Sequence, residues 1–250
     1  MSKVIAVVNQ KGGVGKTTTA INVAAQLALS NKSVLLVDLD PQANATSGLG
    51  IEKASLSTTY DVLCGATTIN QATINTYVNN LWLVPANSDL AAAEVELVAS
   101  DKREFKLAEA IKQLDYDYLI IDCPPALGLL TINALTAADS VLIPVQSEYY
   151  ALEGLGQLLS TIQMIKQRTN PNLNIMGVVV TMFDKRNALS DQVYKELENY
   201  FKETLFTSII PRNVKLAEAP SYGKTIYDHD RWSKGARAYK ALTKEIIKRT

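Results

Sequence analysis

The stretch Gln10-Lys11-Gly12-Gly13-Val14-Gly15-Lys16-Thr17-Thr18 decides the fold of this chain. An apolar run at 4–8 precedes it and a helical pattern at about 18–29 follows it, so the stretch is a glycine-rich turn between a strand and a helix. Glycines leave backbone N–H groups free to point inward and let an anion approach closely. The N-terminus of the following helix adds a partial positive charge. This context predicts a phosphate-binding loop, in which Lys16 reaches the β- and γ-phosphates and the Thr17 hydroxyl ligates Mg²⁺.

The start of this loop departs from the common pattern, which has a glycine six residues before the lysine. Gln10 stands at that position, and a second lysine, Lys11, follows it. Lys11 cannot easily reach the γ-phosphate of its own subunit if Lys16 occupies that space, but it could reach a phosphate on a facing subunit. We therefore hypothesise that the active form is a dimer. The alternative is a solvated lysine beside an anionic ligand.

The composition describes a globular chain without a global electrostatic field. With 250 residues, 47% of them hydrophobic, the chain can bury one sizeable α/β core, and we expect a single domain over 1–250. Because 25 basic and 25 acidic residues balance, binding to nucleic acid or to an acidic membrane requires a local patch. Cys64 and Cys123 lie far apart without metal-type spacing, which favours a reduced, cytoplasmic protein.

Short apolar runs alternate with longer helical patterns along most of the chain. The runs lie at 4–8, 34–37, 81–84, 118–121, 141–145 and 175–180. Several are continuously apolar, as expected of parallel strands that are buried on both faces. The alternation predicts a doubly wound, mainly parallel sheet flanked by helices, with ligands at the carboxyl ends of the strands.

Two segments lie outside this alternation. Residues 44–80 are small and polar, and they indicate an excursion with short helices. The stretch 234–248 is helical and carries a narrow apolar stripe between lysines, formed by Tyr239, Leu242, Ile246 and Ile247. A membrane-surface helix would have such a stripe, but docking against the domain is the commoner fate and is our expectation.

Three aspartates follow apolar strands and should share the edge of the sheet with the loop. Asp38 ends one predicted strand and Asp122 ends another, which places both where they can hold Mg²⁺ from its second coordination shell. Asp40 lies in the loop after Asp38 and is better placed to orient an attacking water. An Asp-Pro pair is also a common loop opener, which is the alternative for Asp40. Cys123 is expected to be a packed thiol.

The last third of the chain carries scattered basic residues. Arg186 and Lys215 stand out because each lies just past a predicted strand, in a loop, with few acids immediately adjacent. As phosphate contacts they would bind DNA without reading its sequence. Solvated surface charge is the alternative.

Together these motifs resemble the ParA/Soj-type chromosome-partitioning ATPases, P-loop proteins of the deviant Walker A group that also includes MinD and the nitrogenase iron protein. Residues 11–18 resemble the signature loop of that group, with Lys11 as its signature lysine. Residues 37–44 resemble its second motif and 121–125 its Walker B strand. The Soj branch is favoured by three further stretches, at 127–134, 148–154 and 210–216. The resemblance covers nearly the whole chain.

The resemblance implies an ATP-dependent sandwich dimer with two nucleotides at its interface and slow ATP hydrolysis. Asp40 would position water, Lys11 would act in trans, and Gly12 would tolerate close approach of the partner. Pro211 and Asn213 would lie near the adenine. The full set implied to bind ATP is Lys11, Gly12, Gly13, Val14, Gly15, Lys16, Thr17, Thr18, Pro211 and Asn213.

The same resemblance implies partners. The ATP-bound homodimer would bind double-stranded DNA non-specifically through residues that match Arg186 and Lys215, and it would then be associated with the nucleoid. Lys215 stands where relatives often hold Arg. A lysine keeps the positive charge but cannot make the bidentate phosphate contact of an arginine. A ParB-type DNA-binding protein would stimulate hydrolysis and release the dimer, supporting chromosome or plasmid partitioning.

Two other members of the group offer alternatives. A MinD-like, membrane-associated regulator of division-site placement would need a free, lipid-binding C-terminal helix, and we regard membrane binding as the weaker expectation. An electron-transfer ATPase like the nitrogenase iron protein would need cysteines that share an iron–sulfur cluster across a dimer. Cys64 and Cys123 do not fit that requirement.

Overall fold

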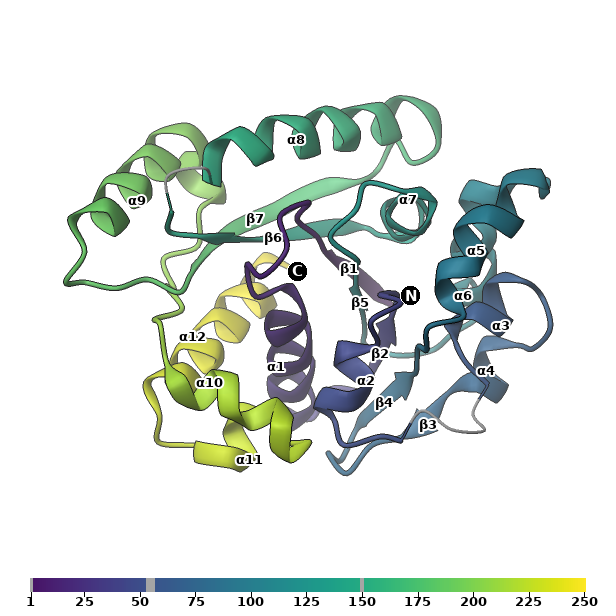
Figure 1. The fold of residues 1–250 in the computed structure, drawn as a ribbon, viewed down its shortest axis with the longest axis horizontal. Helices are drawn as coiled ribbons and strands as arrows, with labels where there is room; N and C mark the ends of the chain where they lie inside the picture. Colours follow the sequence, from purple (N-terminus) through teal and green to yellow (C-terminus); the bar gives the residue numbers. More distant parts are fainter. Residues whose placement is uncertain (1, 53–56, 149–150) are drawn as a thin grey trace.

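The computed structural model describes residues 2–52, 57–148 and 151–250. Its centre is a seven-stranded sheet with the strand order β3-β4-β2-β5-β1-β6-β7 (Figure 1). All neighbouring strands run parallel except β3, which is antiparallel to β4. The strands are β1 (Lys3–Val7), β2 (Val34–Asp38), β3 (Ile74–Asn75), β4 (Leu81–Val84), β5 (Tyr118–Asp122), β6 (Ser140–Gln146) and β7 (Asn174–Thr181). The doubly wound α/β fold is therefore confirmed.

Burial on both faces explains why the strand sequences are continuously apolar. Every residue of β2 and of β5 is buried, including the aspartate that ends each strand. All six predicted runs became strands within a few residues of the expected bounds. The two-residue strand β3 was not predicted, because it lies inside the 44–80 excursion and has no apolar run of its own.

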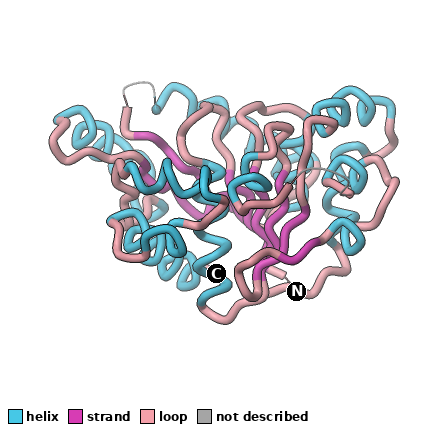
Figure 2. The backbone as a smooth tube through the Cα atoms, turned by 60° about the horizontal axis from the view of Figure 1, so that its bottom comes forward, coloured by secondary structure: helices cyan, strands magenta, loops and turns pink. Residues whose placement is uncertain are grey.

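Helices cover both faces of the sheet, and Figure 2 shows the strands in the middle of the molecule with helices on either side. Side chains of α1 and α12 pack with one face of the sheet, and those of α7, α8 and α9 pack with the other. The helices are α1 (Lys16–Leu29), α2 (Asn44–Gly48), α3 (Thr59–Leu63), α4 (Ile69–Ala72), α5 (Leu90–Glu96), α6 (Lys106–Ile111), α7 (Leu129–Ala137), α8 (Ala151–Arg168), α9 (Ala188–Phe201), α10 (Val214–Glu218), α11 (Ile226–Asp230) and α12 (Lys234–Arg249).

The excursion at 44–80 does contain short helices, namely α2, α3 and α4. Tyr149 and Tyr150, which belong to the 148–154 stretch of the family resemblance, lie outside the described residues.

The C-terminal helix α12 docks against the domain, as expected. Tyr239, Leu242 and Ile246 are buried in the core that α12 shares with α1. At the end of the helix, the Arg249 guanidinium donates to the Met176 carbonyl at 2.9 Å and to other backbone carbonyls nearby, and its central carbon lies 3.9 Å from the centre of the Phe206 ring. The apolar stripe is therefore used inside the protein.

Gly177 in β7 makes this close packing testable. A Cβ atom there would lie 2.5 Å from the Thr204 carbonyl oxygen and 2.6 Å from Nη1 of Arg249. We expect Gly177→Ala to lower the free energy of unfolding by about 2 kcal/mol, the usual effect of overpacking a tight core. Urea denaturation followed by circular dichroism measures it.

Gly156 in α8 is the matched control, because a Cβ there would meet nothing within 4 Å. Gly156→Ala should leave stability unchanged or raise it slightly, since alanine favours a helix over glycine. If Gly177→Ala were as stable as Gly156→Ala, the packing of Arg249 against β7 would not be as tight as described.

Candidate functional site

The glycine-rich loop connects β1 to α1 and has the backbone that its glycines predict. Gly13 and Gly15 have φ angles of +74° and +89°, in the left-handed region that favours glycine. Helix α1 begins at Lys16, and no side chain caps its N-terminus. Uncapped N–H groups at a helix N-terminus attract an anion. The helix begins two residues earlier than expected, so that Lys16 and Thr17 form its first turn.

Two cavities open side by side at this helix end. The first has a volume of about 410 Å³ and is lined by the loop, by the first turn of α1 and by Asp40. The second, of about 390 Å³, extends toward the segment that carries Pro211 and Asn213. A cavity lined by the loop next to a more apolar one matches the two ends of a nucleotide, namely its phosphates and its base.

The aspartates at the ends of β2 and β5 lie next to each other, because the register of the two strands pairs Asp38 with Asp122. The Asp38 carboxylate accepts hydrogen bonds from the Thr46 N–H at 2.8 Å, from the Thr46 hydroxyl at 2.7 Å and from the Asp40 N–H at 3.2 Å. Burial raises the pKa of Asp38 to about 6, although these hydrogen bonds oppose the rise. Asp38 thus holds the Asp40 loop and α2 against the sheet.

Asp122 is in a different situation, because both of its carboxylate oxygens are buried and neither has a partner with normal hydrogen-bond geometry among the described residues. Burial raises the pKa of Asp122 well above its usual range, and the charge of Asp38 adds to the rise, whereas Thr17 and Lys16 oppose it. Buried polar atoms almost always have partners. Oxygen atoms left without one beside a phosphate-loop cavity fit Mg²⁺, which prefers oxygen ligands and keeps several of its waters.

Lys16 points its charge into the same region. The residue is only 6% exposed, and its ammonium donates to the Lys11 carbonyl at 3.2 Å. Burial lowers the pKa of Lys16, and the nearby charge of Asp122 opposes this change. Asp40 is also buried, and its carboxylate accepts a hydrogen bond from the Gln42 N–H at 2.9 Å. Lys16 and Asp40 line one cavity, although 24 positions separate them in the sequence.

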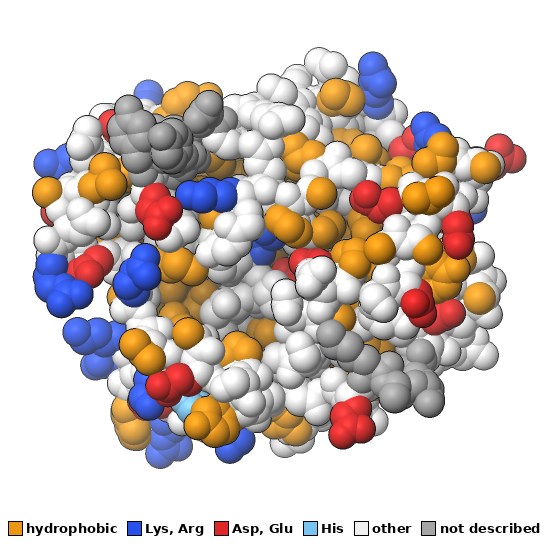
Figure 3. Space-filling model, viewed as in Figure 1, with side chains coloured by type: hydrophobic (Ala, Val, Ile, Leu, Met, Phe, Trp, Pro, Cys, Tyr) orange, Lys and Arg blue, Asp and Glu red, His pale blue; other side chains and the backbone are white. Residues whose placement is uncertain are grey.

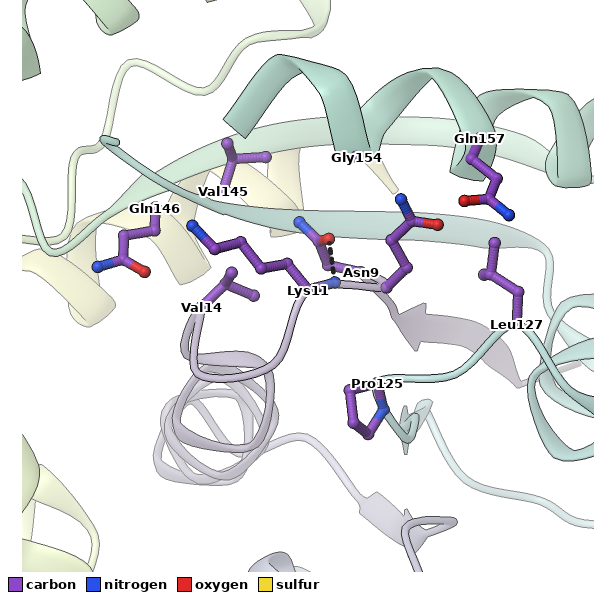
Figure 4. Close-up of a pocket in the computed structure, with 10 residues that line it drawn as sticks. Asn9, Lys11, Val14, Pro125, Leu127, Val145, Gln146, Gly154 and Gln157 are labelled. Atoms are coloured by element: carbon purple, nitrogen blue, oxygen red, sulfur yellow. Dashed lines mark hydrogen bonds between the residues drawn. The ribbon is translucent and has the colours of Figure 1, made fainter. Parts of the chain in front are cut away.

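Lys11 lies outside that cavity. Its ammonium pairs with Glu148 at 3.2 Å, and the two side chains are 35% and 48% exposed. It lines a separate cavity of about 550 Å³, in which its side chain extends toward Gln146 at the end of β6 (Figure 4). The backbone of Lys11 is held by the Asn9 side chain, which accepts from its N–H at 3.0 Å. Lys11 therefore points away from the cavity that Lys16 lines.

The structure adds three polar residues that sequence reasoning missed. Thr46 binds Asp38, Glu148 binds Lys11, and the Thr181 hydroxyl at the end of β7 donates to the Val14 carbonyl at 2.8 Å. A usable signal existed for Thr181, since a polar residue that ends an apolar strand of a parallel sheet belongs at the ligand edge. Glu148 lies in the 148–154 stretch of the family resemblance, although no partner was expected for it, and Thr46 carries no comparable signal.

The two basic residues expected to contact DNA are placed differently from the prediction. Arg186 does lie in a loop, but its guanidinium, 89% exposed, donates to the Asp184 carboxylate at 2.8 and 3.0 Å. Lys215 lies in α10 rather than in a loop, because the Asn213 side chain caps that helix by accepting from the Lys215 N–H at 2.8 Å. Its ammonium pairs with Glu218 at 2.9 Å. Each residue therefore has one acidic partner that the sequence analysis did not assign.

Both residues nevertheless lie on a basic side of the molecule. A cavity of about 810 Å³ there is lined by Lys185, Arg186, Arg212 and Lys234. Residues 210–250 hold ten Lys and Arg against four Asp and Glu. Figure 3 shows Lys and Arg side chains gathered toward the left and lower left, where Figure 1 places α9, α10 and α12. Charge is therefore distributed unevenly although its sum is zero.

A glycine-rich anion site at a helix N-terminus, with two buried aspartates on adjacent strand ends, defines a P-loop nucleotide-binding protein. A family model described as "AAA domain" matches residues 2–175. The chain is 54% identical over 252 residues to the chromosome partitioning protein ParA of Myxococcus xanthus, covering 100% of this chain and 89% of that protein. It is 55% identical over 250 residues to the sporulation initiation inhibitor protein Soj of Bacillus subtilis, covering 98% of each.

Among solved structures, the fold is similar to cobyrinic acid a,c-diamide synthase from Mycobacterium smegmatis with bound ADP and magnesium. The TM-score is 0.87 and the identity 39%, over 99% of this chain and 95% of that one. Because the relatives from Myxococcus and Bacillus match along the whole chain, this protein belongs to the ParA/Soj family of chromosome-partitioning ATPases.

Proposed function

We propose that this chain, acting as one domain, is an ATP-dependent switch for DNA segregation. ATP drives a sandwich dimer that binds DNA non-specifically, and ATP hydrolysis stimulated by a ParB-type partner releases the dimer. The observation that carries this proposal is the different placement of the two lysines of the loop. Lys16 is buried beside Asp122 in the phosphate cavity, whereas Lys11 is held outside it by Glu148.

In this proposal each end of the nucleotide has its own residues. The backbone from Gly12 to Thr18 would surround the phosphates, with Lys16 at the β- and γ-phosphates and the Thr17 hydroxyl on Mg²⁺. Asp38 and Asp122 would accept hydrogen bonds from water molecules bound to the metal. Pro211 and Asn213, which line the second cavity, would lie at the base. The bound Mg²⁺ would neutralise charge that develops on the phosphates.

Hydrolysis would depend on Asp40, which lines the phosphate cavity and is anchored through its neighbours. The Asp38 carboxylate accepts from the Asp40 N–H, and the Asp40 carboxylate accepts from the Gln42 N–H. These two hydrogen bonds hold the Asp40 side chain at the cavity, where it would orient the attacking water. Orientation of a nucleophile is the main task a protein has in phosphoryl transfer.

Dimerisation would release Lys11 from Glu148. An ion pair that is a third to a half exposed contributes only about 0–1 kcal/mol, so little opposes its exchange for a phosphate of the facing subunit. Gly12 offers open space for that approach, because a Cβ there would meet nothing within 4 Å.

The MinD-like alternative finds less support. It needs a free C-terminal helix, and α12 is docked through Tyr239, Leu242 and Ile246. Within the part of the chain that the structure describes, no helix has the length and apolar character needed to cross a bilayer. Liposome co-sedimentation with ATP separates the two functions. Binding to liposomes but not to DNA would overturn the partitioning proposal.

DNA binding itself should depend on nucleotide, on salt and on Arg186. We expect random-sequence duplex DNA to bind with ATP and Mg²⁺ but weakly with ADP or without nucleotide, and association with the nucleoid would follow from the ATP-bound state. Arg186→Ala should weaken this binding and reduce the slope of log K against log salt by about two, since the dimer loses one phosphate contact from each subunit. Fluorescence anisotropy at several salt concentrations measures both effects.

Arg103→Ala is the matched control for Arg186→Ala. Arg103 is also partly exposed and also pairs with an acidic neighbour, Glu104, at 3.1 Å. It precedes α6 and does not line the cavity that Arg186, Arg212 and Lys234 line, so its loss should leave DNA binding unchanged. Equal effects of the two substitutions would argue against a localised DNA surface at Arg186.

A further inference from the structure

Met182 has a position that none of the sequence motifs covers. It follows Thr181 at the end of β7 and lines both cavities at the N-terminus of α1. Gly15 and Thr18 are the other residues that line both, and they belong to the glycine-rich loop and the first turn of the helix. A ligand that spans the two cavities must therefore pass Met182, which comes from a different part of the chain.

The backbone of Met182 is strained, which is a second and independent observation. Its φ angle is +51°, in the left-handed region, and a residue with a Cβ pays about 1 kcal/mol to stay there. The segment on either side is fixed, because the Thr181 hydroxyl donates to the Val14 carbonyl and the Phe183 N–H donates to the Ile210 carbonyl at 3.1 Å. Strain of this kind is typical of functional sites, where a side chain must be directed to one place.

The side chain is directed at the loop. A Cβ built on Gly15 would lie 4.0 Å from the terminal methyl of Met182, so the thioether lies over the last glycine of the loop. The second cavity is also lined by apolar side chains, including Ile210, Pro211 and Leu216. A methionine is flexible and polarisable, and its sulfur makes favourable contacts with aromatic rings. These properties suit a nucleoside better than a phosphate.

We infer that Met182 contacts the nucleoside of the bound nucleotide at the junction of the two cavities, and that it positions the base. The inference rests on the proposed binding of ATP. It adds a specificity-determining residue that acts on the base and ribose, while the phosphates are held by other residues. Asp40 and Lys16 line only the phosphate cavity, whereas Met182 lines both cavities.

Two ligands separate this role from a merely structural one. ATP fills both cavities, whereas tripolyphosphate fills only the phosphate cavity. With Mg²⁺ present, we expect Met182→Ala and Met182→Gly to raise the Kd of ATP about fivefold, because the apolar contact with the nucleoside is lost. The Kd of tripolyphosphate should change by less than about twofold, because its contacts are with the loop. Isothermal titration calorimetry measures both constants.

Three variants act as controls. Met182→Leu keeps most of the side-chain volume and should restore ATP binding to within about twofold. Met182→Gly removes the backbone strain and Met182→Ala keeps it, so equal losses in the two assign the effect to the side chain. Met164→Ala removes an exposed methionine of α8, 48% accessible, and should change nothing.

The other possible results would contradict either this inference or the proposed function. If ATP binds the variants as it binds the unmodified chain, Met182 does not contact the nucleoside. If tripolyphosphate binding falls by the same factor as ATP binding, Met182 acts through the loop and the inference is wrong. If the unmodified chain binds neither ligand, the proposed function is wrong and this inference fails with it. That result differs from failure of the inference alone, in which the unmodified chain still binds ATP.

Discussion

Lys16→Ala should abolish ATP binding and turnover while leaving the protein folded. The ammonium is buried beside the phosphate cavity, where a charge-assisted contact with phosphate is worth far more than in water. We expect the Kd of ATP to rise at least about 100-fold, corresponding to a loss of about 3 kcal/mol. Isothermal titration calorimetry and a phosphate-release assay measure the two effects.

The fold should tolerate this change because burial of Lys16 disfavours its charge, as its lowered pKa indicates. Removing the ammonium therefore removes an unfavourable desolvation together with the ligand contact. Lys32→Ala, which removes a lysine paired with Asp117 at 3.9 Å on the surface, is the control and should bind ATP normally. Turnover retained in Lys16→Ala would refute the assignment of the phosphate loop.

Asp40→Ala should keep ATP binding but stop hydrolysis, and so trap the dimer. The carboxylate lines the phosphate cavity without being part of the loop, so its loss removes water orientation and leaves the phosphate contacts in place. We expect turnover to fall about 100-fold or more, the usual contribution of a positioned acid or base. Phosphate release under single-turnover conditions measures the rate, and light scattering after size exclusion with ATP measures the mass.

Asp40→Asn provides a finer test, because an amide keeps the hydrogen bond from the Gln42 N–H but loses the negative charge. It should behave like Asp40→Ala in turnover if the carboxylate itself orients the water. An Asp40→Ala protein that bound ATP yet stayed strictly monomeric would contradict the link between ATP and dimerisation.

The acidic edge of the site was predictable from sequence because it follows from a general property of parallel sheets. Asp38 and Asp122 each end a continuously apolar run, and carboxyl ends of parallel strands meet at one edge. The sheet then pairs them directly. The same argument explains why the loop, Lys16 and Asp40 could be assigned to one cavity before their distances were known.

The surface contacts were not predictable in the same way. Glu148 binds Lys11 across 137 positions, and Thr46 reaches Asp38 only because α2 folds back over the end of β2. Arg186 and Lys215 were expected to have few acids immediately adjacent, but each pairs with one acidic side chain two or three residues away. Side-chain direction, which depends on local backbone geometry, decided these pairs.

What the sequence by itself determined is the α/β sheet, the phosphate loop and the aspartates at its edge, because each depends on short-range patterns of apolar residues and glycines. Only the tertiary structure decided where the two loop lysines point, that α12 is docked, and that Met182 lies between two cavities. These features depend on elements far apart in the chain that meet only after the sheet has brought their ends together. The direction in which a charged side chain points depends on its neighbours in space, and these cannot be read from the sequence.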